Sequence, residues 1–430
     1  MSAAIDQLPP AAAPSVAWWR EPTGAQWGAF AAAWIAWVLD AFDFTVYLLV
    51  ASAISKELGV SLTLASFSVT LTLLMRMVGG LTAGAIADRA GRKKPLLFAI
   101  AWFALCDAAI FAAPSFTFVF IFRTLFGLGM GAQWTSGATL AMENWPERSK
   151  AIASGLLQGS WAIGYILAAQ AYKWIVPAHG WRALFLVAAA PAVLALPLVA
   201  LVKEGPRAAR TLASGATTVA VKFSALFKPP YRDRLIWAAI VEALGFGVYY
   251  AMAALWPSFL GKERKLDPAA IATLVTYFNL ANLAGSVVCG WLASKRGIAI
   301  AVWLPALLML PLIPLYLQTS NEHLWIGALC AGGIGVAYVG ITPLLLTGLF
   351  EPEVRARAVG LVYHVGASFA AIVPPATAFA YDHFGWPLSR SIAVSIAFCE
   401  FFLAVALWLR PAGVLVPPSR ISPNRRNDPA

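Results

Sequence analysis

The sequence predicts an all-α integral membrane protein in which twelve transmembrane helices form two six-helix bundles related by a parallel repeat. Three observations lead to this fold class. Of the 430 residues, 60% are hydrophobic and only 12% are charged, and the mean hydropathy is +0.74. The apolar residues gather in long runs, and a run of about 20 residues suffices to cross a bilayer. Short segments of the first half of the chain also recur in the second half.

The apolar runs place the helices in order along the chain, with charges, Pro or Gly between them. We expect helices at residues 27–53, 62–87, 93–112, 116–142, 149–174, 181–202, 234–260, 268–292, 299–318, 322–347, 354–380 and 386–409. The longest polar stretch follows the sixth helix and separates the two bundles. The expected domains are a cytoplasmic N-terminal segment (1–26), an N-terminal six-helix bundle (27–202), a cytoplasmic central loop (203–233), a C-terminal six-helix bundle (234–409) and a cytoplasmic tail (410–430).

The repeat is carried by three pairs of segments that keep the same order and orientation in both halves. The members of a pair are 205 or 206 residues apart: 84–94 and 290–297, 127–132 and 332–337, 145–155 and 350–360. Such spacing indicates a duplicated six-helix unit. Two parallel halves with a binding site between them at mid-membrane are typical of transporters that work by alternating access.

Lys and Arg are distributed unequally between the two sides of the predicted membrane. The side of the termini and the central loop has 22 of them, the other side has seven, and Arg76 and Arg123 lie within helices. Because loops rich in Lys and Arg stay in the cytoplasm, we expect both termini there, in a bacterial inner membrane. The net charge of +11 thus reflects topology. We expect no nucleic-acid partner, because the basic residues form no single patch.

Other classes of protein lack their signatures in this sequence. The four cysteines (Cys106, Cys289, Cys330 and Cys399) stand singly without a C-x-x-C pair, so neither a zinc site nor a disulfide framework is indicated. The four histidines show no metal spacing, which argues against a membrane-embedded enzyme, and no Walker motif for ATP occurs. We expect no cofactor, no metal and no catalytic residues. The N-terminus lacks the basic and apolar regions of a cleaved signal peptide.

The motifs of the chain resemble those of the major facilitator superfamily over residues 27–410. The strongest match is G-A-I-A-D-R-A-G-R-K-K at 84–94, and Arg123 before G-L-G-M-G and G-W-R-A-L-F at 180–185 fit as well. The resemblance implies the twelve-helix fold of that superfamily and alternating access between its two halves.

The same resemblance implies a gating role for the loop between the second and third helices. Asp88 lies near a helix C-terminus, where the helix dipole disfavours a negative charge. It would therefore contact Arg92 or the region near Val354 and hold the two halves together on the cytoplasmic side. The gating residues implied are Gly84, Asp88, Arg89, Gly91 and Arg92.

A closer resemblance is to the sialate/lactate proton symporter branch of the superfamily. It is carried by D-A-F-D-F at 40–44, by the segments 122–134 and 153–165, and by A-A-Q-A-Y at 168–172. Relatives in that branch usually carry Glu where this chain has Gln133, so we expect a single proton per cycle.

The closer resemblance implies a monomeric proton symporter for a small organic acid anion, with sialate or a lactate-like monocarboxylate first. Aromatic-acid proton symporters share the paired aspartates and are the alternative. Drug/proton antiport is the second alternative, although the fifth helix lacks the Gly-Pro pair of such antiporters.

Four ionisable residues within the apolar helices are the main candidates for the chemistry, because charges at mid-membrane are expensive and usually functional. Asp40 and Asp43 share a helix face, and two adjacent carboxylates in a low dielectric cannot both readily ionise. One of them, Asp43 first, is expected to bind the coupling proton, with Arg123 holding its charge across helices 1 and 4. Arg76 offers a planar guanidinium for the substrate carboxylate. Static ion pairs are the alternative interpretation of each.

Further polar residues inside apolar runs are candidates for the lining of a substrate cavity, with interhelical hydrogen bonds as the alternative. They are Gln133, Gln158, Tyr249, Asn279, Asn282 and His364. Asp107, Glu242 and Glu400 are also embedded in apolar runs. Glu242 is an additional site candidate, whereas Glu400 is expected to face a protein partner or to reach the interface. The 18 Trp residues are expected mainly as interfacial anchors or packing residues.

Overall fold

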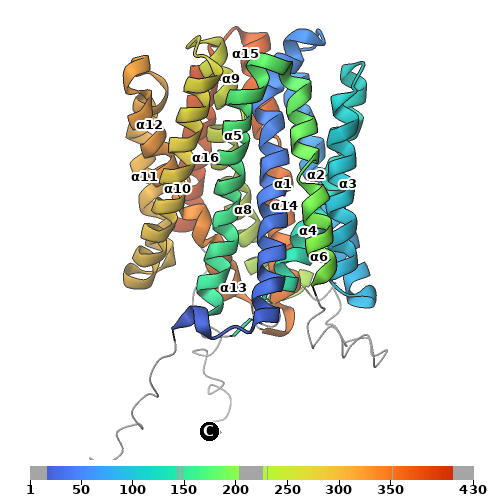
Figure 1. The fold of residues 1–430 in the computed structure, drawn as a ribbon. Helices are drawn as coiled ribbons and strands as arrows, with labels where there is room; N and C mark the ends of the chain where they lie inside the picture. The colour runs from blue at the N-terminus through green and yellow to red at the C-terminus, as the bar shows by residue number, and fades with distance from the viewer. Residues whose placement is uncertain are drawn as a thin grey trace, which may run out of the picture.

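The computed structural model describes residues 17–142, 145–146, 149–202, 226–229, 231–350 and 352–409, and all the regular elements in these ranges are helices. The helices stand side by side in one bundle (Figure 1). We call the end where α1 begins and α16 ends the tail end, and the opposite end the far end. Most of the expected central loop and most of both terminal segments lie outside the described residues, so those domain boundaries stay predictions.

In the N-terminal half the first four helices follow the expected bounds within a few residues, whereas the fifth, expected at 149–174, continues to Ala189 as one element with a kink at Gly180. After the short 3-10 helix η1 (Trp18–Arg20), a capping box of Thr23 and Gln26 starts the first long helix. The long helices are α1 (Gly24–Glu57), α2 (Leu62–Ala90), α3 (Lys93–Phe111), α4 (Phe116–Met142), α5 (Lys150–Ala189) and α6 (Ala192–Leu201).

The C-terminal half has the same plan, but three of its membrane helices are interrupted. The seventh is α8 (Tyr231–Ala253) plus α9 (Trp256–Lys262), the eighth α10 (Pro268–Arg296) and the ninth α11 (Ile298–Leu317). The tenth comprises η3 (Asn321–His323), α12 (Leu324–Cys330), the π-helical turn η4 (Ala331–Gly335), η5 (Ala337–Ile341) and α13 (Thr342–Leu349). The last two are α14 (Pro352–Ala370) plus α15 (Val373–Phe384), and α16 (Leu388–Trp408).

Twelve membrane crossings are confirmed once the longest apolar stretch is divided. Eleven candidate spans occur in the described part of the chain, and one of them, Ile152–Leu201, has 50 residues. A continuous helix of that length would measure about 75 Å, more than twice the ~30 Å hydrocarbon core. The chain turns back within it at Gly180, where φ is 75° and ψ is 175°. This stretch therefore holds the fifth and sixth helices.

The sequence repeat is also a repeat of local geometry. Helix α2 ends at Gly91 with φ 85°, and α10 ends at Gly297 with φ 94°. These glycines are 206 residues apart, and each N–H donates to the carbonyl four residues earlier at 3.0 Å. Positive φ favours glycine, so both turns require it.

Equivalent glycines also pack equivalent helices together. A Cβ on Gly127 of α4 would collide with the backbone carbonyl of Thr72 in α2. A Cβ on Gly332 of η4 would collide with that of Phe278 in α10 in the same way. Helix 4 therefore packs on helix 2 as helix 10 packs on helix 8, through small residues that let backbones approach closely.

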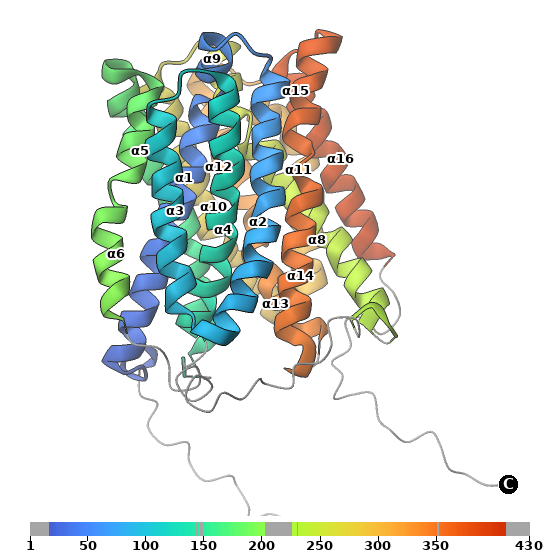
Figure 2. The same ribbon diagram turned by 90° about the vertical axis from the view of Figure 1, so that its right-hand side faces the viewer.

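The two halves meet along two seams. Helix α5 lies beside α10 (Figure 1), and α2 lies beside α14 and α15 (Figure 2). At the far end of these seams, Thr63 donates from its backbone N–H (2.7 Å) and its hydroxyl (2.6 Å) to Asp382. Nearer mid-membrane, Thr70 donates to the carbonyl of Ala371 at 2.6 Å. These bonds close the far end of the interface.

Candidate functional site

Asp40 and Asp43 lie in the middle of α1, and both are 0% exposed. No hydrogen-bond partner for their carboxyl oxygens is found among the described residues. The charges of Arg76 and Arg123 act on Asp40, and those of Asp107, Asp40 and Arg123 act on Asp43. A buried carboxylate without a hydrogen-bonding partner is expensive in its charged form. The pair is thus arranged as the sequence predicted, within one electrostatic cluster.

Arg123 is buried in α4 beside this pair, but its ion pair runs to a different helix from the expected one. Its Nη1 lies 3.7 Å from Oδ1 of Asp107 in α3, and it donates to the main-chain carbonyl of Asp43 at 3.4 Å. The guanidinium also lies over the rings of Tyr47 and Phe126, at 4.9 and 4.3 Å. The side chain of Arg123 therefore contacts helix 1 through the main-chain carbonyl of Asp43. The negative charge that pairs with Arg123 belongs to Asp107.

Arg76 lies between the two halves inside an aromatic cage formed by Trp37, Trp134, Trp161 and Tyr363. Its guanidinium carbon is 5.7, 5.9 and 5.3 Å from the ring centres of Trp37, Trp161 and Tyr363, within range of cation–π attraction. The ring of Trp134 is stacked on that of Tyr363 at 5.2 Å. Because Tyr363 belongs to α14 and the tryptophans to α1, α4 and α5, both halves build the cage.

Polar contacts of Arg76 are few. Its Nη2 donates to the hydroxyl of Tyr363 at 3.2 Å, and its Nε has no hydrogen-bond partner among the described residues. A guanidinium carries five donors in a planar fork, so most of its capacity is directed at aromatic faces. Such a group can receive a carboxylate in a bidentate fashion.

The other predicted lining residues make different kinds of contact, and none is seen to bond to Arg76 among the described residues. Tyr249 accepts from Trp161 Nε1 at 2.9 Å, across the two halves. Asn279 bonds within its own helix and has a free buried oxygen, and Asn282 accepts from Ser286 at 3.4 Å. Buried oxygens without hydrogen-bond partners among the described residues also belong to Gln133 and Gln158.

His364 follows Tyr363 in α14 and packs against Gly80 of α2. A Cβ on Gly80 would lie 2.5 Å from Nε2 of His364. The other ring nitrogen, Nδ1, is buried without a hydrogen-bond partner among the described residues. His364 is therefore at the interface, one residue from the aromatic cage.

The predicted gating loop is described in part. Gly84 packs on α4 at ordinary van der Waals distance. A Cβ placed on Gly84 would lie 3.6 Å from the side chain of Thr135. Arg92 precedes the first residue of α3. The side chains of Asp88 and Arg89 lie outside the described residues, so their gating contacts stay a prediction.

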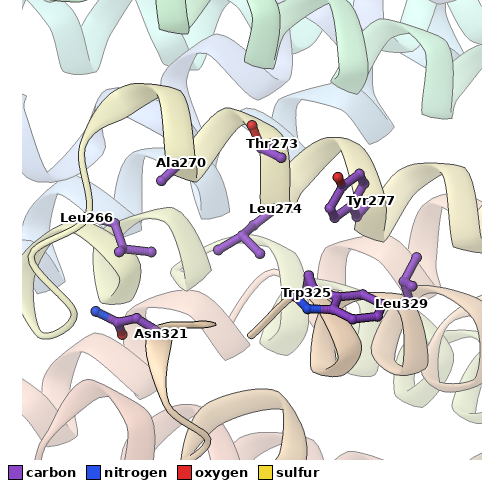
Figure 3. Close-up of a pocket in the computed structure, with 8 residues that line it drawn as sticks. All are labelled: Leu266, Ala270, Thr273, Leu274, Tyr277, Asn321, Trp325 and Leu329. Atoms are coloured by element: carbon purple, nitrogen blue, oxygen red, sulfur yellow. The ribbon is translucent and has the colours of Figure 1, made fainter. Parts of the chain in front are cut away.

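Two of the hollows in the described part of the chain lie near the far end, and Arg76 lines neither of them. A groove of about 600 Å³ lies between α10 and the tenth helix, on the outer face of the C-terminal half (Figure 3). Its rim includes Tyr277 and Trp325, which are both exposed. A cavity of about 10 Å³ lies between the halves beside Thr45 and Asn279, roughly the space of one water probe.

Sequence reasoning did not foresee the cage. The expectation that most tryptophans serve as anchors or packing residues did not single out Trp37, Trp134 and Trp161, which surround or support the Arg76 guanidinium. Their positions near Asp40, next to Gln133 and near Gln158 were the available signal. Glu400 was also expected at a protein or membrane surface, but it is 0% exposed inside the C-terminal bundle.

The comparisons with known proteins agree with this architecture. The sequence matches the family model described as Major Facilitator Superfamily over residues 33–347 and 243–428. The structure is similar to the crystal structure of a D-xylose-proton symporter, with a TM-score of 0.72 and 16% identity, over 88% of this chain and 97% of that one. The chain therefore belongs to the major facilitator superfamily and is a multi-pass membrane transporter.

Two relatives match more than four fifths of the chain. The sialic acid transporter NanX of Escherichia coli (strain K12) is 26% identical over 394 residues, 90% of this chain and 95% of NanX. The cis,cis-muconate transport protein of Acinetobacter baylyi is 29% identical over 361 residues, 82% of this chain and 86% of that protein. Both relatives are named for organic acids.

Proposed function

We propose that this transporter is a proton-coupled symporter that takes up a small organic acid anion. The observation that carries the proposal is Arg76, a buried cation at the interface of the two halves that donates a hydrogen bond to Tyr363 and has a buried acid, Asp40, as its neighbour. An anion that binds Arg76 brings a negative charge close to Asp40 and favours the protonated carboxyl. Binding of the anion and of the proton therefore support each other.

Asp43 is the proposed carrier of the proton, with Asp40 tuning it and Arg123 supplying a fixed positive charge. When the site faces the outside, Asp43 takes a proton from water and the anion binds Arg76. The loaded, nearly neutral site then reorients, since moving unpaired charge through a low dielectric is costly. On the other side the anion and the proton leave into water.

The surroundings of Arg76 favour a planar, unsaturated or aromatic acid as substrate. The cage presents ring faces on which a flat molecule can stack. A polyhydroxylated sugar acid needs many hydrogen-bond donors and acceptors, because its hydroxyls are costly to bury without partners. Sialate is the second candidate, supported by the relative that covers 90% of the chain. Uptake would run across a bacterial inner membrane, with both termini in the cytoplasm, as the distribution of Lys and Arg predicts.

The test is transport by purified protein in proteoliposomes with a panel of carboxylates that includes benzoate, cis,cis-muconate, lactate and sialate. A pH gradient, acidic on the substrate side, should drive accumulation of at least one flat acid, with proton uptake in step. If none of these acids moves with protons, the proposed symport is wrong.

Variants at the paired aspartates then test the proton site. Asp43→Asn keeps the shape but cannot ionise. It should abolish accumulation against a gradient, yet still exchange labelled for unlabelled substrate, because exchange requires only that the loaded carrier reorient. Asp40→Asn should shift the pH optimum and retain some accumulation. Glu57→Gln, at the exposed far end of α1, is the control and should accumulate as wild type. Accumulation by Asp43→Asn would assign the proton to another residue.

A further inference from the structure

The C-terminal half contains a second set of buried acids, which the proposed mechanism does not use. Glu242 in α8 is 2% exposed and Glu400 in α16 is 0% exposed. Neither has a salt bridge to a described residue. Both carboxyl oxygens of Glu400 and Oε2 of Glu242 lack a hydrogen-bond partner among the described residues. Two carboxyls are kept at this depth although unpaired charge there is expensive.

Tyr338 of η5 carries a hydroxyl that is electrostatically close to both acids. It is 0% exposed, and its hydroxyl has no hydrogen-bond partner among the described residues. Its ring packs on α8, 3.7 Å from a Cβ placed on Gly245, and Gly245 lies one helical turn from Glu242. The electrostatic neighbours of its hydroxyl are Glu400, Cys399, Glu242 and Cys289. A hydroxyl between two carboxyls can pass a proton from one to the other.

One hydroxyl is within reach of Glu242. The side chain of Thr342 is within hydrogen-bonding reach of Glu242, and the same hydroxyl lies 3.0 Å from the carbonyl of Val339. Because a hydroxyl has a single hydrogen to donate, Thr342 cannot donate to Val339 and to a charged Glu242 at the same time.

This acid is connected to the Arg76 cage through Tyr363. Arg76 and Glu242 are both electrostatic neighbours of Tyr363, whose oxygen accepts from Arg76 at 3.2 Å. The α14 backbone is close to Glu242 as well, because a Cβ on Gly366 would lie 2.8 Å from the Glu242 Cβ. An anion that binds Arg76 would therefore draw Arg76 away from Tyr363 and favour the protonated form of Glu242.

We propose that Glu242, Tyr338 and Glu400 form a second proton-binding site, in the C-terminal half, and that Glu242 exchanges its proton once per transport cycle. The inference rests on the proposed symport and replaces the single proton per cycle expected from Gln133. The second proton enters Glu242 from outside water while the anion binds and leaves to inside water after the anion. Tyr363 is a positioning residue that couples Glu242 to the bound anion.

The membrane potential distinguishes the two stoichiometries. One proton with a monovalent anion moves no net charge, so accumulation responds to a pH gradient alone. With a second proton the cycle carries one positive charge, and each ~60 mV, negative inside, adds about tenfold to the accumulation ratio. The experiment uses proteoliposomes with equal pH on both sides, a potassium diffusion potential set by valinomycin, and radiolabelled benzoate or the monocarboxylate that the panel selects.

Wild type is expected to accumulate the anion under the potential alone. Glu242→Gln should lose that response and still accumulate the anion under a pH gradient, and the exposed Glu322→Gln is the matched control. If wild type responds to the pH gradient and not to the potential, the second site is wrong and the proposed function stands. If neither gradient drives any acid of the panel, the proposed function is wrong. The existence of the second proton-binding site is then tested by infrared titration, as follows.

Infrared titration of the purified protein needs no substrate. The protonated-carboxyl absorption of wild type should fall as the pH rises, and Glu242→Gln should lack one component of that fall. Glu400→Gln and Tyr338→Phe should move the same component to a different pH. These two variants keep the proposal testable if Glu242→Gln does not fold. Titrations identical to wild type in all variants that fold would overturn the proposal.

Discussion

The bonds between Thr63 and Asp382 make a specific prediction about the balance between the open and closed states of the far end. Asp382 of α15 caps the first turn of α2 from the other half of the molecule, where backbone N–H groups lack partners within the helix. Asp382→Ala removes both bonds and introduces no new clash. The far end should then open more often.

The magnitude follows from the two bonds. A side-chain cap on a helix N-terminus is worth about 0.5–2 kcal/mol, and a hydroxyl hydrogen bond about 0.5–1.5 kcal/mol. Asp382 is exposed and Thr63 is half-buried, so the lower part of these ranges applies. A loss of about 1–2 kcal/mol changes the closed-to-open ratio by a factor of about 5 to 30. Thr63→Val removes the hydroxyl bond alone and should give a smaller shift.

Distance measurements between spin labels on Leu64 and Phe384 test this prediction, in a chain whose native cysteines are replaced. Both positions are exposed at the far end of the α2–α15 seam. Asp382→Ala should transfer population from a short to a long distance, and Thr63→Val should do so to a lesser extent. Asp233→Ala, which removes an exposed pair with Arg232 inside one half, is the control. A wild-type distance distribution in Asp382→Ala would refute the role assigned to this contact.

Three further predictions concern the site and the packing. Arg76→Lys keeps the charge but loses the planar fork, so substrate affinity should fall about 10- to 100-fold, the cost of about 1.4–3 kcal/mol of charged hydrogen bonding; unchanged binding by calorimetry would exclude Arg76 as the carboxylate contact. Asp107→Asn leaves Arg123 buried without its ion-pair partner and should lower the free energy of unfolding by about 3 kcal/mol or more. Glu57→Gln, in an exposed pair, should cost about 0–1 kcal/mol. Equal melting temperatures of the two variants would contradict this prediction. Gly131→Ala places a methyl against the backbone carbonyl of Arg76 and should cost about 1–3 kcal/mol, whereas Gly155→Ala, with open space around it, should melt as wild type.

The helices and their repeat could be predicted from the sequence because each depends on local composition. Apolar runs predict the crossings, and the paired glycines at the ends of α2 and α10 permit the positive φ that both turns adopt. The interruptions of the second half were not predicted, because hydropathy is continuous across them. Pro257 and Pro374, at the starts of α9 and α15, were the available signal, since proline removes a helix hydrogen bond.

The candidate site residues stood out in the sequence more clearly than their partners did. Asp40, Asp43, Arg76 and Arg123 stood out because a charge inside an apolar run is rare, and all four are buried. Which of them face one another depends on how each helix is rotated about its own axis. Because these helices are apolar on all sides, the sequence does not indicate that rotation. For this reason Arg123 was assigned to helix 1, when its ion pair is with Asp107 of α3.

The interruptions also make the two bundles mechanically unequal. Helices α1 and α4 are continuous over 34 and 27 residues, whereas their repeat counterparts, the seventh and tenth helices, are broken near Ala254 and Gly335. A continuous helix moves as a rod, and a helix that lacks backbone bonds at one level bends there at little energetic cost. We therefore expect the N-terminal bundle to act as a fixed frame during the cycle, while the C-terminal bundle changes its own shape. Amide hydrogen exchange should then be fastest, among buried segments, at those two breaks.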